Sequence, residues 1–71
     1  MIQNNPAVIA AAFALLHTPN ARMRLPHVLA AAQVSRATIY ERMARGGFPR
    51  PRPIGRRSVA WVSDEVRAAL G

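Results

Sequence analysis

The sequence predicts a mainly helical protein with one small β-hairpin. Three observations support this fold class. Two helix-forming runs meet at a short turn within residues 26–45, a proline-rich stretch leads into a β-branched and aromatic strand, and an almost wholly apolar run lies near the N-terminus. Because the chain has only 71 residues, we expect a small core, with an N-terminal hydrophobic segment at 1–21 and a main domain at 22–71.

The N-terminal segment predicts an extra helix. Asn5 is a suitable cap residue, and Pro6 suits the first helical position. The apolar run at 7–16, AVIAAAFALL, is too short to cross a bilayer. A helix that is apolar all round must be buried on more than one side. We therefore expect this helix to complete the core, with or without an oligomer contact, through Val8, Ile9, Ala12, Phe13 and Leu16.

The central stretch at 26–45 predicts two short helices joined by a tight turn. Ser35 is a good N-cap for the second helix, since its hydroxyl can accept a backbone N–H of the next turn. Ile39 and Met43 are four residues apart and share one apolar face. Gly46-Gly47 supplies a C-cap. Small and basic residues face outward, which fits a recognition helix in a DNA major groove, but also an ordinary helical hairpin with a solvated face.

The stretch after the second helix predicts a basic β-hairpin. Three alternating prolines in residues 48–53 forbid a helix, and we expect Phe48 to enter the core beside Met43. Residues 54–62 then predict a hairpin with its tip at 55–57 and with Val59 and Trp61 on the buried face. Such a hairpin corresponds to the wing of a winged helix-turn-helix, whose basic tip can reach phosphates or the minor groove. The alternative is a solvated charged hairpin.

Two flanking segments complete the expected core. Residues 22–25, RMRL, alternate, so that Met23 and Leu25 face inward from a short extended piece. A final helix begins with Ser63 as its cap, carries two acidic residues in its first turn, and packs through Val66 and Leu70.

The charge of the chain indicates a polyanionic partner. All ten basic residues are arginines, and with three acidic residues the net charge is +7. Arginine binds phosphate and guanine edges bidentately, so nucleic acid is the first candidate. Codon bias in a GC-rich genome would explain the absence of lysine, but it would not explain the shortage of acidic residues.

Catalysis and metal binding have little support in the sequence. The acidic residues Glu41, Asp64 and Glu65 accompany no nucleophile–base set. His17 and His27 share no metal-ligand spacing, and the chain has no cysteine, which excludes disulfides and thiolate chemistry. We therefore expect neither an enzyme, nor a metal site, nor another cofactor.

The run from Arg24 to Leu70 resembles the AlpA family of phage and prophage regulators, within the MerR-like and excisionase-like winged helix-turn-helix group. The residues that carry the resemblance are Arg24-Leu25-Pro26, Val28, Leu29, the run 34–40 (VSRATIY), Gly46, Phe48-Pro49, Pro51, the run 54–61 (IGRRSVAW), Glu65-Val66 and Leu70. The chain departs from the family pattern at Gln33, where glycine is usual, and at Ala69, where tryptophan is frequent. The segment before Arg22 lies outside the pattern.

The resemblance implies a winged helix-turn-helix protein of a mobile element that binds specific double-stranded DNA. Two roles are open: an excisionase, or recombination directionality factor, and a transcriptional regulator. The implied partners are DNA, an integrase or tyrosine recombinase, and further copies of the chain on DNA, in the bacterial cytoplasm at the nucleoid. The expected DNA contacts are Ser35, Arg36, Thr38, Tyr40, Arg45, Arg50, Arg52, Arg56 and Arg57.

The alternative of a different class is a basic peptide that binds membranes or RNA. It would use residues 7–16 as an anchor and the arginines as a cationic patch that binds an anionic surface. The arginines, however, cluster far from that segment, with eight of the ten after residue 35.

Overall fold

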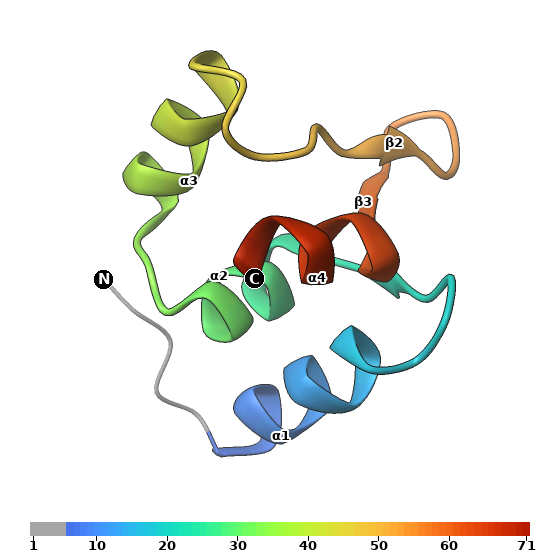
Figure 1. The fold of residues 1–71 in the computed structure, drawn as a ribbon. Coiled ribbons are helices and arrows are strands. Elements are labelled where there is room, and N and C mark those ends of the chain that lie inside the picture. The colour runs from blue at the N-terminus through green and yellow to red at the C-terminus, as the bar shows by residue number, and fades with distance from the viewer. Residues whose placement is uncertain (1–5) are drawn as a thin grey trace.

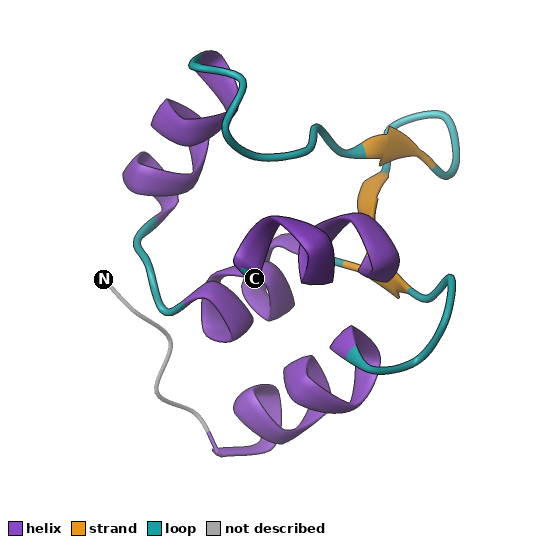
Figure 2. Cartoon of the chain, viewed as in Figure 1, coloured by secondary structure: helices purple, strands orange, loops and turns teal. Residues whose placement is uncertain are grey.

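The structure is a computed structural model that describes residues 6–71 (Figure 1). Its elements are α1 (Pro6–Leu16), β1 (Arg22–Met23), α2 (Leu25–Ala32), α3 (Arg36–Ala44), β2 (Arg52–Pro53), β3 (Val59–Val62) and α4 (Ser63–Leu70). The strands form one antiparallel sheet in the order β1-β3-β2 (Figure 2). The described chain is therefore mainly helical with a small three-stranded sheet, an arrangement consistent with a winged helix-turn-helix.

Helix α1 packs against α2 and α4. Ala12 and Leu16 are buried, and Val8 is half-buried, as the sequence predicts. Phe13 of the expected contact stripe is 39% exposed and does not contribute to the core, whereas Leu15 packs against it. Adjacent helical residues lie about 100° apart, so a face centred on Ala12 turns Phe13 outward. Ile9 is half-buried at the edge of the same face. The expected cap at Asn5 lies outside the described residues.

The turn between α2 and α3 has a left-handed backbone at position 33, where glycine is usual in the family pattern. Gln33 is the C-cap of α2 with φ of +57° and ψ of +41°, in the left-handed region. Its backbone N–H donates to the Leu29 carbonyl at 2.8 Å. A side chain in this region costs on the order of 1 kcal/mol relative to glycine.

Both ends of α3 follow the predicted caps. The Ser35 hydroxyl accepts the Thr38 N–H at 3.2 Å, which confirms the N-cap. At the other end, Gly46 has φ of +78° and donates to the Met43 carbonyl at 3.1 Å. Gly47 donates to the Arg42 carbonyl at 2.8 Å. These two bonds form a Schellman motif, which stops the helix where a left-handed residue is needed.

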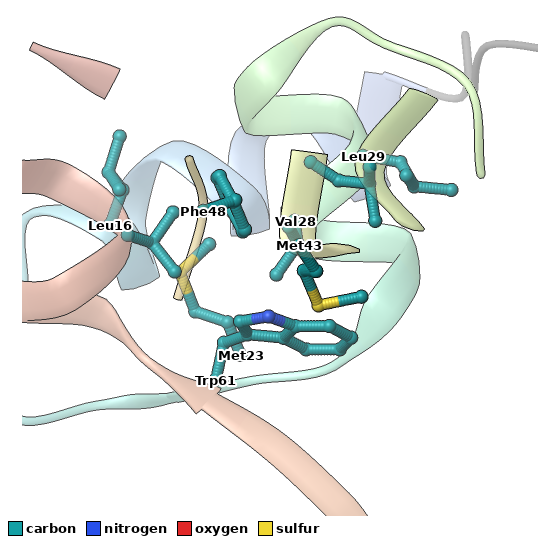
Figure 3. Close-up of a cluster of buried hydrophobic side chains, with 9 residues drawn as sticks. Leu16, Met23, Val28, Leu29, Met43, Phe48 and Trp61 are labelled. Atoms are coloured by element: carbon teal, nitrogen blue, oxygen red, sulfur yellow. The ribbon is translucent and has the colours of Figure 1, made fainter. Parts of the chain in front are cut away.

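The core surrounds Trp61 on the central strand β3. Trp61 is 2% exposed, and its Nε1–H donates to the Pro49 carbonyl at 2.9 Å, which ties the segment after α3 to the sheet. Phe48 and Met43 lie in the same buried cluster, as expected (Figure 3). Ile39 is fully buried and fixes α3 on this cluster.

Two expectations for the C-terminal third are wrong. Val59 is 44% exposed, because the face that it shares with Trp61 opens onto a surface groove at the hairpin end of β3. Ser63 is not the cap of α4; that position is Val62, and Ser63 is the first helical residue. The buried Ser63 hydroxyl accepts the Ala21 N–H at 2.9 Å and donates to the Thr18 carbonyl at 2.6 Å, so it ties the α1–β1 turn to α4.

Candidate nucleic-acid interface

Helix α3 presents one apolar face to the core and one polar face to solvent. Ile39 and Met43 are buried, as the sequence predicts, whereas the expected contacts Arg36, Tyr40 and Arg45 are exposed. The small outward residues on this helix are Ala37 and Ala44. Small side chains allow the helix axis to approach a groove floor closely, while the longer ones reach to either side.

The remaining two predicted contacts of α3 have a structural role at its start. Ser35 and Thr38 are half-buried, and their hydroxyl oxygens lie 3.0 Å apart in a hydrogen bond. Both hydroxyls are therefore engaged within the chain, and they order the first turn of α3. A phosphate that binds either hydroxyl must therefore compete with, or add to, the hydrogen bonds of the N-cap.

Helix α3 carries one further arginine that was not among the DNA contacts expected from the sequence. Arg42 is exposed and lies three residues before Arg45, on the same side of the helix. That spacing could have identified it. Arg45 has only a loose partner, Glu41, with 4.0 Å between Nη2 and Oε1, and both side chains are more than 60% exposed. Exposed pairs of this kind contribute little, so Arg45 is available to another anion.

The predicted hairpin is present and places its tip arginines in solvent. Residues 52–62 form the wing, defined here as β2, β3 and the loop between them. Its loop is closed by a hydrogen bond from the Ile54 N–H to the Ser58 carbonyl at 2.9 Å. Arg56 and Arg57 at the tip are exposed, and Arg50 is exposed in the segment before β2.

Arg52 differs from the other wing arginines because it is paired. Its Nη2 lies 2.5 Å from Glu65 Oε2, and its Nε donates to Glu65 Oε1 at 3.4 Å. This fork joins β2 to α4. The hydrogen bond and the charge of Arg52 lower the pKa of Glu65 against a smaller opposing effect of desolvation, and the same contact raises the pKa of Arg52. A phosphate that takes the Nε and Nη2 edge of Arg52 must displace this carboxylate, because both groups already donate to Glu65.

A surface groove of about 400 Å³ separates the start of α2 from α3 and the wing. Its lining residues are Arg24, Leu25, Pro26, Tyr40, Arg57, Ser58, Val59 and Trp61. The groove brings together two predicted contacts, Tyr40 and Arg57, which are 17 positions apart in sequence. It also contains Arg24, which sequence reasoning assigned to the motif but not to the contact surface.

The α1 residues expected in an oligomer contact are remote from these arginines. Figure 1 shows α1 at the opposite end of the molecule from α3 and the wing. Arg67 of α4 donates to the Leu16 carbonyl at 2.6 Å and pairs with Asp64, so this arginine serves the α1–α4 contact. None of the helices in residues 6–71 has the length and hydropathy of a membrane span.

Comparison with known proteins identifies the family of the chain. Residues 22–68 match the family described as prophage CP4-57 regulatory protein (AlpA), and the chain belongs to this family. The match begins after α1, so that helix lies outside the matched region.

The chain is also similar to a particular phage protein. It is 41% identical over 46 residues to the uncharacterized protein ORF88 of Enterobacteria phage P4. The aligned region covers 65% of this chain and 52% of that relative, so the chain spans about half the length of ORF88. No solved structure matches the chain.

Proposed function

We propose that the chain is a winged helix-turn-helix protein that binds specific double-stranded DNA, with α3 in the major groove and the wing along the phosphates or in the minor groove. The observation that supports this most strongly is the exposure of Arg36, Tyr40 and Arg45 on α3 together with Arg56 and Arg57 on the wing. The net charge of +7 adds a long-range attraction for DNA.

The role that we assign is that of an excisionase, or recombination directionality factor, of a mobile element. In this role the protein binds beside an attachment site, bends the DNA and directs a tyrosine recombinase towards excision. The second candidate is a transcriptional regulator, and the regulatory description of the matched family favours it. Both roles use the same DNA-binding surface and place the protein at the nucleoid in the bacterial cytoplasm.

We assign DNA binding to residues 22–71 and self-association on DNA to the N-terminal segment at 1–21. The support for self-association is the exposed, charge-free outer side of α1, which carries Phe13. A Phe13→Ser variant should bind a single site normally but lose cooperativity between adjacent sites. Since Phe13 is outside the buried core, its replacement leaves the fold intact. Unchanged cooperativity would show that the Phe13 side of α1 takes no part in self-association on DNA.

A gel shift across the element's attachment region and its own promoters separates the two roles. At physiological salt and with excess competitor DNA, a directionality factor gives stepwise complexes beside the attachment site. A shift confined to a promoter would instead identify a transcriptional regulator. The absence of any specific shift would refute DNA recognition and favour a membrane or RNA partner, which liposome co-sedimentation and an RNA shift would then separate.

A further inference from the structure

The groove between the start of α2, α3 and the wing combines positive charge with an apolar floor. Arg24 and Arg57 line it, together with Val59 and Trp61. The structure records no ion pair for Arg24 or Arg57 among the described residues, whereas Arg52 and Arg67 both have an acidic partner. The two groove arginines are therefore free to meet an external anion.

The floor of the groove contains apolar surface that the fold leaves uncovered. The large hydrophobic side chains that are exposed in the described chain are Phe13, Tyr40, Ile54 and Val59. Two of these four, Tyr40 at 49% and Val59 at 44%, line this groove. An exposed β-branched residue beside a tyrosine and unpaired arginines suits a ligand that has both an apolar part and an anionic part.

We propose that this groove binds the sugar–phosphate backbone of one DNA strand, with Arg24 and Arg57 on a phosphate and Val59 and Tyr40 against the adjacent deoxyribose. Tyr40 and Ser58 also line the groove, and both residues carry a hydroxyl that can donate a hydrogen bond. This assignment rests on the proposed function and adds to it a backbone site that includes Arg24, outside both α3 and the wing.

The position of the groove gives this site a mechanical consequence. Its walls come from the start of α2, from α3 and from the wing. A strand seated there contacts all three, so it fixes the wing relative to the recognition helix. The contact carries no base information, because phosphate and sugar contacts set register and orientation only. Loss of Arg24 should therefore weaken binding to all sequences alike.

Arg22 provides a matched control for Arg24. It is also an exposed arginine, two positions earlier on the same extended segment, and its replacement changes the net charge equally. Arg22 lines a different hollow, beside Arg52 on the other side of the wing. A difference between the two variants therefore reports the groove rather than the overall charge.

The test measures duplex affinity across a salt series for native protein, Arg24→Gln and Arg22→Gln. Loss of one phosphate contact should reduce the steepness of the salt dependence by about 0.9 and weaken binding about 8-fold at about 0.1 M salt. We expect this change for Arg24→Gln on specific and random duplexes, and a smaller change without loss of slope for Arg22→Gln. Equal behaviour of the two variants would overturn the assignment, whereas failure of the native protein to bind any duplex would overturn the proposed function with it.

Neutral methylphosphonate linkages, placed one at a time in the duplex, locate the phosphate. At one position the neutral linkage should weaken DNA binding by the native protein. It should not weaken binding by Arg24→Gln any further, because that variant has already lost the contact. A penalty that persists in the variant would exclude Arg24 from that phosphate. Inorganic phosphate at constant ionic strength should leave affinity unchanged; displacement of DNA would show a pocket for free anions instead.

A Val59→Ala variant tests the sugar contact separately. It should weaken binding while leaving the salt dependence unchanged, since the lost contact is uncharged. Val59 pairs with Pro53 at the end of the hairpin, where truncation leaves Trp61 and the buried cluster in place. Unchanged affinity would show that no sugar lies on this floor.

Discussion

Replacement of Glu65 by glutamine releases a wing arginine from the ion pair that holds it. In the structure, the Glu65 carboxylate accepts two hydrogen bonds from Arg52, at 2.5 Å and 3.4 Å. Arg52 is 63% exposed even while paired, so the same guanidinium is within reach of DNA. Glu65→Gln therefore offers one more cation to the phosphates without a change in the wing sequence.

The size of the effect follows from the release of counterions. If roughly six arginines meet phosphates, the logarithm of the affinity falls against the logarithm of salt with a slope near −5. One additional contact makes the slope about 0.9 steeper and raises affinity about 8-fold at about 0.1 M salt. This is the upper limit, because phosphate can also displace Glu65 from Arg52 in the native protein.

Asp64→Asn is the matched control for this variant. Asp64 is the neighbouring residue in the first turn of α4, and its partner is Arg67, which contacts α1 rather than the wing. Fluorescence anisotropy on one duplex across a salt series should show a steeper slope for Glu65→Gln and an unchanged slope for Asp64→Asn. Equal shifts would show a general charge effect. Weaker binding by Glu65→Gln would show that the ion pair positions the wing, and would refute competition between Glu65 and phosphate.

Three further predictions concern specificity, stability and pH. Arg36→Ala should lower the ratio of specific to random binding, whereas Arg52→Ala should weaken both alike; equal ratios in a competition assay would contradict these roles. Gln33→Gly should stabilise the fold by about 1 kcal/mol and raise the Tm by about 4–8 °C, because it relieves the left-handed strain at φ of +57°. Gln33→Ala is the control, since it keeps the Cβ and the strain. A lower Tm for the glycine variant would refute the strain. Hydrogen bonds from arginine hold the pKa of Glu65 and of Asp64 below the ordinary value, so the stabilisation from both pairs is present near neutral pH and is lost as pH falls through the lowered folded-state pKa. On acidification, the Tm should therefore fall further for native protein than for Glu65→Gln, and identical acid profiles would contradict the pair's contribution.

The features that could be predicted from the sequence are those set by local rules. The cap at Ser35 depends on the next three residues, and the end of α3 depends on Gly46 and Gly47. The inward face of α3 follows from the spacing of Ile39 and Met43. For the same reason, the hairpin tip was predicted from its glycine and the strand that follows. These local features define the exposed face of α3 and the tip of the wing.

The features that could not be predicted depend on contacts between distant segments. Ser63 lies at a position that suits a cap, but its hydroxyl bonds to Thr18 and Ala21, more than 40 residues away. Val59 alternates correctly with Trp61, yet only the fold shows that no element covers it. The partner of Arg52 is on another element, 13 residues on, and could not be chosen from among the three acidic residues by spacing.

DNA recognition by α3 and the wing is tested most directly by comparing two duplexes of equal length. One carries the site recovered by selection from a random pool, and the other carries the same bases scrambled. Across a salt series, both duplexes should show a slope near −5, and the selected site should bind at least about 1,000-fold more tightly. Affinity that does not change with salt, or equal affinity for the two duplexes, would contradict recognition of DNA by this surface.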